Sequence, residues 1–224
     1  LPNYNLLEIL TRIGHNENVL FMKRLLLILI LTFSFQSWTK ADDIKEFEIE
    51  GVNIGDSLLD YFTKEKIESS TKTTYPNKKF YDIHITVESD QYDQLTYTVK
   101  NGDKKFIIEQ LSGDKFYYKP NSNKNIDKMH LACLKQKNKI SEEFEKMLSD
   151  TRRNDYKHTY KTIDNGKSFS VVTDFEFKDL SAIRIYCNKF TKETTDKRNF
   201  FNGLSVSISP VKILNWLNNK AYKQ

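Results

Sequence analysis

Histidines and nearby carboxylates are the side chains of this sequence best suited to acid–base or metal chemistry. Three histidines follow residue 41, namely His84, His130 and His158. Asp82 precedes His84 by two residues, so on a strand both side chains would share one face and could offer two ligands to a metal ion. A metal site needs at least one more ligand, and no cluster of His or Cys lies nearby. We therefore expect no metal site, and we expect His84 on the solvent face of its strand.

The remaining titratable groups give no sign of a catalytic arrangement. His130 lies at the edge of the apolar stripe of a predicted helix, which favours a packing role, whereas His158 lies in a polar segment typical of a surface. The acidic pairs Glu142-Glu143 and Asp174/Glu176 would matter only if their environments separated their pKa values, so we expect them on solvated faces.

Sequence motifs for known chemistries are also missing. The chain has no Gly-rich phosphate loop, no G-x-S-x-G, no H-E-x-x-H and no EF-hand pattern, and its 7 glycines leave little material for such loops. The sequence therefore assigns no catalytic residue and no cofactor.

Tyrosines offer a second kind of site, an aromatic face for sugars or peptides. Tyrosine is equally an ordinary strand residue, which favours packing within a sheet. Both interpretations apply to Tyr81, Tyr97, Tyr117, Tyr118, Tyr160 and Tyr186.

The two cysteines of the sequence, Cys133 and Cys187, are predicted to form a disulfide. Cys133 lies on the apolar stripe of a predicted helix, and Cys187 shares one strand face with Ile183 and Ile185, so both sulfurs should point into the same core. An even pair in an oxidising compartment is most simply a disulfide, worth about 4 kcal/mol by chain entropy. The alternatives are two buried free thiols or a reactive thiol, which needs a polarised and partly open setting.

The segment 22–41 is predicted to be a secretory signal peptide. Lys23-Arg24 form a basic start, residues 25–35 form an apolar run of about a dozen residues, and Thr39 and Ala41 occupy the −3 and −1 positions of a cleavage site. The apolar run is shorter than the roughly 20 residues of a membrane span. We expect a periplasmic or secreted protein with no transmembrane segment after cleavage.

Residues 1–21 are interpreted as an extension upstream of the true start at Met22, and residues 42–224 as a single domain. The chain carries a formal net charge of +5, without any block of five or six like charges. A nucleic-acid-binding protein would show a clustered basic stripe, so we expect no nucleic-acid partner.

Hydrophobic periodicity predicts an α+β domain. Antiparallel, hairpin-linked strands are joined by a long central helix at 126–148, with short N- and C-terminal helices, all packed on one face. The N-terminal helix is expected near 55–62 and the C-terminal helix after Ser209-Pro210. Strands are expected at 83–87, 95–99, 106–108, 116–118, 156–163, 168–177, 182–187 and 204–208, with Asn-Gly turns at 101–102 and 165–166.

Parts of the sequence resemble a group of uncharacterised exported proteins of marine bacteria. The resemblance is carried by the stretch 47–62 (FEIEGVNIGDSLLDYF), by 216–222 (WLNNKAY) and by the order of a Cys-bearing helix and a Cys-bearing strand. It implies export and a shared fold, and no activity.

These observations favour a non-enzymatic binding or envelope accessory module, with an envelope protein or a small ligand as partner. The alternative is a small exported hydrolase without a recognisable motif, using residues such as Asp82 and His84.

Overall fold

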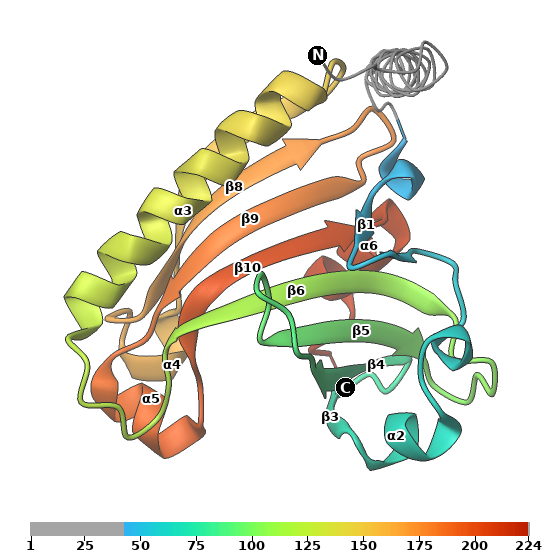
Figure 1. The fold of residues 1–224 in the computed structure, drawn as a ribbon, viewed down its shortest axis with the longest axis horizontal. Coiled ribbons are helices and arrows are strands. Elements are labelled where there is room, and N and C mark those ends of the chain that lie inside the picture. Colours follow the sequence, from blue (N-terminus) through green and yellow to red (C-terminus); the bar gives the residue numbers. More distant parts are fainter. Residues whose placement is uncertain (1–42, 224) are drawn as a thin grey trace, which may run out of the picture. The chain divides into compact units, whose positions relative to one another are not determined.

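An eight-stranded sheet dominates the fold of the described residues, 43–223, in the computed structural model (Figure 1). The strand order is β3-β4-β5-β6-β10-β9-β8-β7, and every neighbouring pair is antiparallel. The strands are β3 (Thr71–Thr74), β4 (Phe80–Thr86), β5 (Gln94–Lys100), β6 (Ile108–Tyr118), β7 (Arg152–Thr159), β8 (Phe169–Glu176), β9 (Ala182–Lys189) and β10 (Asn202–Ser209).

A two-stranded ribbon and several helices complete the fold of the described residues. The ribbon is formed by β1 (Glu48–Ile49) and β2 (Val52–Asn53). The α-helices are α2 (Lys64–Ser69), α3 (Ile126–Met147), α4 (Lys161–Asp164), α5 (Lys192–Arg198) and α6 (Val211–Asn219), and short 3₁₀ turns are η1 (Ile44–Glu46) and η2 (Leu58–Asp60). The α+β class and the antiparallel pairing are confirmed.

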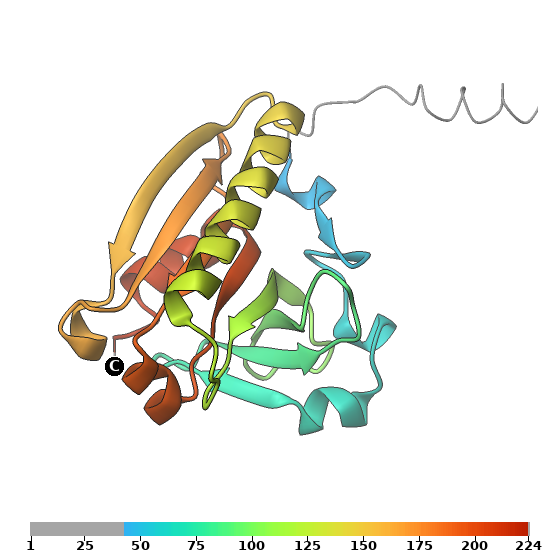
Figure 2. The same ribbon diagram turned by 60° about the vertical axis from the view of Figure 1, so that its left-hand side comes forward.

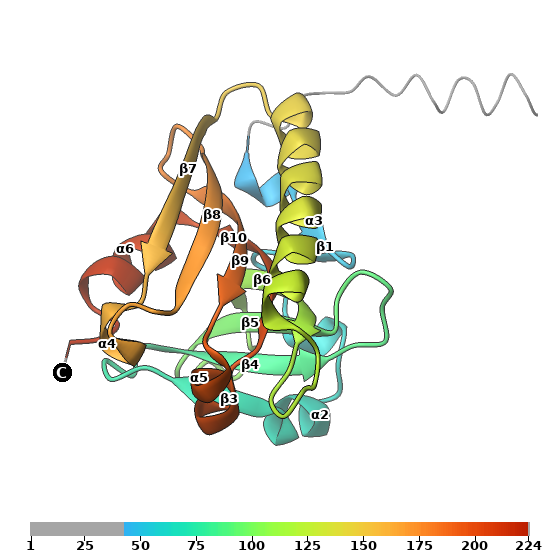
Figure 3. The ribbon, with the colours of Figure 1, turned by 90° about the vertical axis from the view of Figure 1, so that its left-hand side faces the viewer.

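Two four-stranded meanders make up the sheet. The first runs β3 to β6, the second runs β7 to β10, and α3 connects them along the chain. They join where β6 pairs with β10, and the strand direction swings through a large turn from β7 to β4 (Figures 2 and 3). Right-handed twist accumulates over eight strands, and register shifts at Thr98/Val99 and Asn202/Gly203 add local bends.

The main core lies between one face of the sheet and α3. Helix α3 contacts β6, β9 and β10, and Cys133 of α3 packs in one buried cluster with Ile183, Ile185 and Leu111 of the sheet. Strand alternation explains this arrangement, because Ile183, Ile185 and Cys187 all project from the same side of β9.

Helix α6 packs on the opposite face of the sheet, which differs from the predicted arrangement with all helices on one face. Ile213 and Trp216 of α6 form a separate buried cluster with Phe80 of β4, and Trp216 packs edge-on against Tyr75 and Phe80. Figure 3 shows α3 and α6 on either side of the sheet. Ser209-Pro210 indicates where a helix starts but not the face of the sheet on which it lies, so the side could not be predicted.

Other predicted elements are displaced or merged. The helix expected near 55–62 is a 3₁₀ turn capped by Ser57, and it is followed by the short helix α2, which the sequence did not indicate. The expected strand at 116–118 is the end of the 11-residue β6. Residues 1–42, including the predicted signal segment up to Ala41, lie outside the described residues.

The predicted disulfide between Cys133 and Cys187 is present, with Cα atoms 6.0 Å apart. It ties the middle of α3 to the core face of β9 across 54 residues of chain. Within residues 43–223, no helix combines the length and apolar character that a membrane span requires.

Removing the disulfide should destabilise the domain. Cross-linking residues 54 apart restricts the unfolded chain by about 4 kcal/mol on the entropy model. We expect the Cys133→Ala/Cys187→Ala variant to lose roughly 3–4 kcal/mol of unfolding free energy in urea titrations under oxidising conditions. Titration of the wild type in reductant is the control. Equal stability of the oxidised wild type and the variant would show that the cross-link is not a stabilising element.

Candidate functional site

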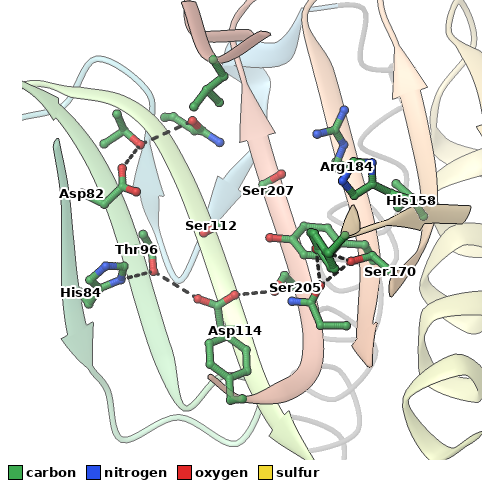
Figure 4. Close-up of a pocket in the computed structure, with 18 of the residues that line it drawn as sticks. Asp82, His84, Thr96, Ser112, Asp114, His158, Ser170, Arg184, Ser205 and Ser207 are labelled. Atoms are coloured by element: carbon green, nitrogen blue, oxygen red, sulfur yellow. Dashed lines mark hydrogen bonds between the residues drawn. The ribbon is translucent and has the colours of Figure 1, made fainter. Parts of the chain in front are cut away.

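A polar groove of about 540 Å³ lies on the face of the sheet opposite α3. Its floor spans both meanders, and Leu217, Asn218 and Tyr222, from α6 and the segment after it, line one side. The side chains come from alternate positions of seven strands, because residues two apart on a strand project from the same face. Figure 4 shows many of them pointing into the same space.

The groove is hollow because its centre is built from small residues. Ser112 of β6 pairs with Ser207 of β10 at the seam between the two meanders, and Ser205 follows on β10. Larger side chains stand on the strands to either side, such as His84 on β4 and Arg184 on β9. A serine floor between larger side chains leaves space that neither meander would enclose alone.

A chain of hydrogen bonds crosses the floor from β3 to β10. The two ring nitrogens of His84 lie 2.8 Å from the Thr73 hydroxyl and 3.0 Å from the Thr96 hydroxyl. Thr96 donates to Asp114 Oδ2 at 3.1 Å, and Ser205 donates to Asp114 Oδ1 at 2.5 Å. Figure 4 draws this chain from His84 to Ser205. It holds the Asp114 carboxylate in place with neutral donors alone.

A second buried carboxylate, Asp82, lies on the same side of the groove as α6. It accepts hydrogen bonds from the Tyr75 hydroxyl at 2.6 Å and the Thr98 hydroxyl at 2.7 Å. The side chains of Asp82 and Asp114 are 8% and 5% exposed. Burial raises the pKa of both carboxyl groups, and the hydrogen bonds that they accept offset part of this effect.

On the β7–β9 side of the groove, the positively charged Arg184 already forms an ion pair. Arg184 donates from Nε and Nη2 to the two carboxylate oxygens of Asp174, at 2.7 and 3.0 Å. Tyr156 donates to the same carboxylate at 3.0 Å, and burial raises the pKa of this tyrosine to about 12. Nearby, Tyr160, Ser170 and Asn188 form a closed set of neutral hydrogen bonds.

The structure brings Asp82 and His84 together in this groove, and His84 is half-buried there and not on an open solvent face. His158 is exposed at the groove's edge, as expected for a surface residue, and His130 is buried against the ring of Phe169. Among residues 43–223, no group of three or more His, Cys, Asp or Glu is arranged to hold a metal ion.

The tyrosines considered for an aromatic face divide between the core and the groove. Tyr97 and Tyr118 are fully buried in the interior, whereas Tyr160 and Tyr186 line the groove. Neither the number of tyrosines nor their spacing distinguishes these two groups, because the sheet face on which a tyrosine lies depends on the strand register.

The groove was missed from the sequence, although one signal was available. In a chain in which 29% of residues are charged, the groove lining contains neither lysine nor glutamate and instead presents Ser, Thr, Tyr, Asn, Gln and Asp. An open polar face of a sheet would carry those long charged side chains. Alternating strands whose polar face lacks Lys and Glu therefore indicate a face shielded from bulk solvent.

Comparison with protein-family models, with curated proteins and with solved structures found no match for this chain.

Asp114 should make the stability of the domain fall as the pH rises. Burial raises the pKa of its carboxyl, so the native state keeps a proton that the unfolded state releases near pH 4. The resulting stabilisation is complete below the unfolded pKa and is lost as pH rises through the native pKa. The Asp114→Asn variant has no such titrating group. Its unfolding free energy should therefore increase relative to that of the wild type as pH rises above about 4, by at most about 1.4 kcal/mol per pH unit.

Asp103→Asn is the control with the opposite sign, because hydrogen bonds from the backbone of Ile107 and Lys105 lower the pKa of Asp103. That variant should lose stability relative to the wild type as pH rises from the lowered native pKa of Asp103 to about 4, and the difference should stay constant above that pH. Urea titrations from about pH 2 to pH 8 measure both. Parallel curves for Asp114→Asn and wild type would contradict the assignment.

Proposed function

We infer that residues 42–224 act as an exported binding module that receives a small polar ligand in the groove. The export part is supported by the basic, apolar and small-residue pattern of residues 22–41 and by a disulfide of the kind that persists in oxidising compartments. A periplasmic or secreted location follows from the same two observations.

The observation that carries the binding role is the shape and chemistry of the groove. Its volume lies within the range of roughly 300 to 1,000 Å³ found for small-molecule sites. Shielded hydroxyl, amide and carboxylate groups converge on a hollow with a serine floor, and each of them costs free energy to keep away from bulk water. A ligand that displaces this water and forms fixed hydrogen bonds with these groups would offset that cost. The packing of the sheet alone does not explain why polar groups converge there.

A small ligand fits the described surface better than an envelope protein does. The large hydrophobic side chains that are exposed are divided among η2 and its C-cap, α3, β7, the β8–β9 turn and the segment after α6, and of these only Tyr156 and Tyr222 line the groove. Protein interfaces are built around contiguous buried patches, which scattered single residues do not provide.

The alternative role as a hydrolase is less well supported. Asp82 and both nitrogens of His84 already have hydrogen-bond partners within the groove wall. Asp82 and Asp114 are two strands and four residues apart in register, so their Cα atoms lie about 16 Å apart.

Filling the groove floor should abolish binding. Ser112→Phe places a large ring at the centre of the groove, where Ser112 faces Ser207 across the β6–β10 seam. We expect ligand-observed NMR against a panel of sugars, amino acids and amines to give saturation-transfer signals with the wild type that disappear with this variant.

Thr86→Phe is the matched control, because Thr86 is exposed on β4 outside the groove lining. This variant should retain the signals, and thermal melts should show that both variants are folded. Signals that survive Ser112→Phe would place the binding site elsewhere, and a panel without any binder would argue against a binding role for the groove.

A further inference from the structure

The charge of the groove is opposite to that of the chain. The protein carries a formal net charge of +5, and its groove lining contains no lysine. Arg184 is the arginine of the lining, and its charge is matched by Asp174 at 2.7 Å. Asp82 and Asp114 are therefore acidic groups whose charge, when they are ionised, is not matched by a lysine or arginine of the lining, and neither forms an ion pair with any residue in the described part of the chain.

His84 is the titratable base that faces both carboxylates. Figure 4 shows His84 and Thr96 between Asp82 and Asp114, with Thr96 linking the imidazole to Asp114. A single imidazolium could balance at most one of the two carboxylates. With both of them ionised, at least one buried negative charge is left without a cation, and such a charge is costly in a protein interior.

Aromatic rings stand next to these carboxylates. The groove lining includes Tyr75 beside Asp82, Tyr186 on β9 across the seam, and Phe201 and Tyr222 at its edges. The faces of aromatic rings attract ammonium groups as well as apolar chains, so the walls complement an organic cation with an aliphatic body.

We propose that the groove binds a linear organic polycation of the polyamine type, with one ammonium group near Asp114 and another near Asp82. This inference depends on the binding role proposed above and names the class of its ligand. The two aspartate Cα atoms lie about 16 Å apart, and each side chain reaches toward the groove, so a flexible chain with several ammonium groups can approach both. The hydroxyls and amides between them can accept hydrogen bonds from the remaining N–H groups.

Isothermal titration calorimetry with spermidine tests this inference on residues 42–224 purified with the disulfide intact. Spermidine should bind the wild type at about 0.15 M salt, and the diamine putrescine should bind more weakly because its chain is shorter and carries one ammonium group fewer. Asp114→Asn and Asp82→Asn should each weaken spermidine binding at least about tenfold, the loss typical for truncating one partner of a desolvated charge pair.

Asp60→Asn is the matched control, because it removes the same charge at an exposed position on η2. It should change spermidine affinity by less than twofold. Equal losses in all three variants would indicate non-specific attraction and overturn the proposal, as would the absence of spermidine binding to the wild type.

A neutral trisaccharide, maltotriose, separates the failure of this inference from the failure of the binding role. Maltotriose binding that is abolished by Ser112→Phe, together with no spermidine binding, would overturn the polycation and leave the binding role standing. If neither probe binds and no member of the wider NMR panel binds, both proposals fail. Thermal melts of Asp114→Asn and Asp82→Asn verify that any loss is not a loss of folding.

Discussion

The pairing of β6 with β10 is the contact on which the remaining architecture depends. It joins two meanders that are far apart in the chain, and it carries the serine floor and the Ser205–Asp114 hydrogen bond, whose residues are 91 positions apart. The close approach of the two strands requires Gly203, since a Cβ there would lie 2.2 Å from the carbonyl oxygen of Lys115. The groove is therefore a property of the assembled sheet, and neither meander has it alone.

The same sheet divides the molecule into two faces with different physical tasks. On the α3 face, burial of apolar side chains and the disulfide supply stability. On the other face, polar groups are removed from bulk water, which is tolerable only because hydroxyls and amides pair across neighbouring strands in rows. The raised pKa of Asp82 and Asp114 shows that this pairing does not fully replace water around a carboxylate. Stability and the proposed ligand recognition are thus assigned to opposite faces of one sheet.

How far the sequence predicts this structure depends on which face a residue occupies. The alternation of Ile83 and Ile85, or of Ile183, Ile185 and Cys187, predicted strands with one buried face, and the disulfide followed from that alternation together with the helical stripe around Cys133. The opposite positions are polar, a pattern that predicts a solvent-exposed face, as expected for His84. Only the strand order places Asp114 beside Ser205, and strand order is set by contacts distant in sequence. The Asn-Gly pair at 202–203 illustrates the same limit, because it lies within β10 although such pairs are typical of turns.

Strand β9 shows how both faces are encoded in one short segment. Cys187 points into the core and bonds to α3, while its neighbours Tyr186 and Asn188 point into the groove. The cross-link therefore fixes the strand that positions groove side chains without reaching the groove itself. Reduction would act on the groove only by loosening the packing of β9 against α3, so the groove can keep its side-chain arrangement in any compartment where the domain stays folded. An oxidising compartment secures that condition, which connects the proposed export of this protein to the geometry of its groove.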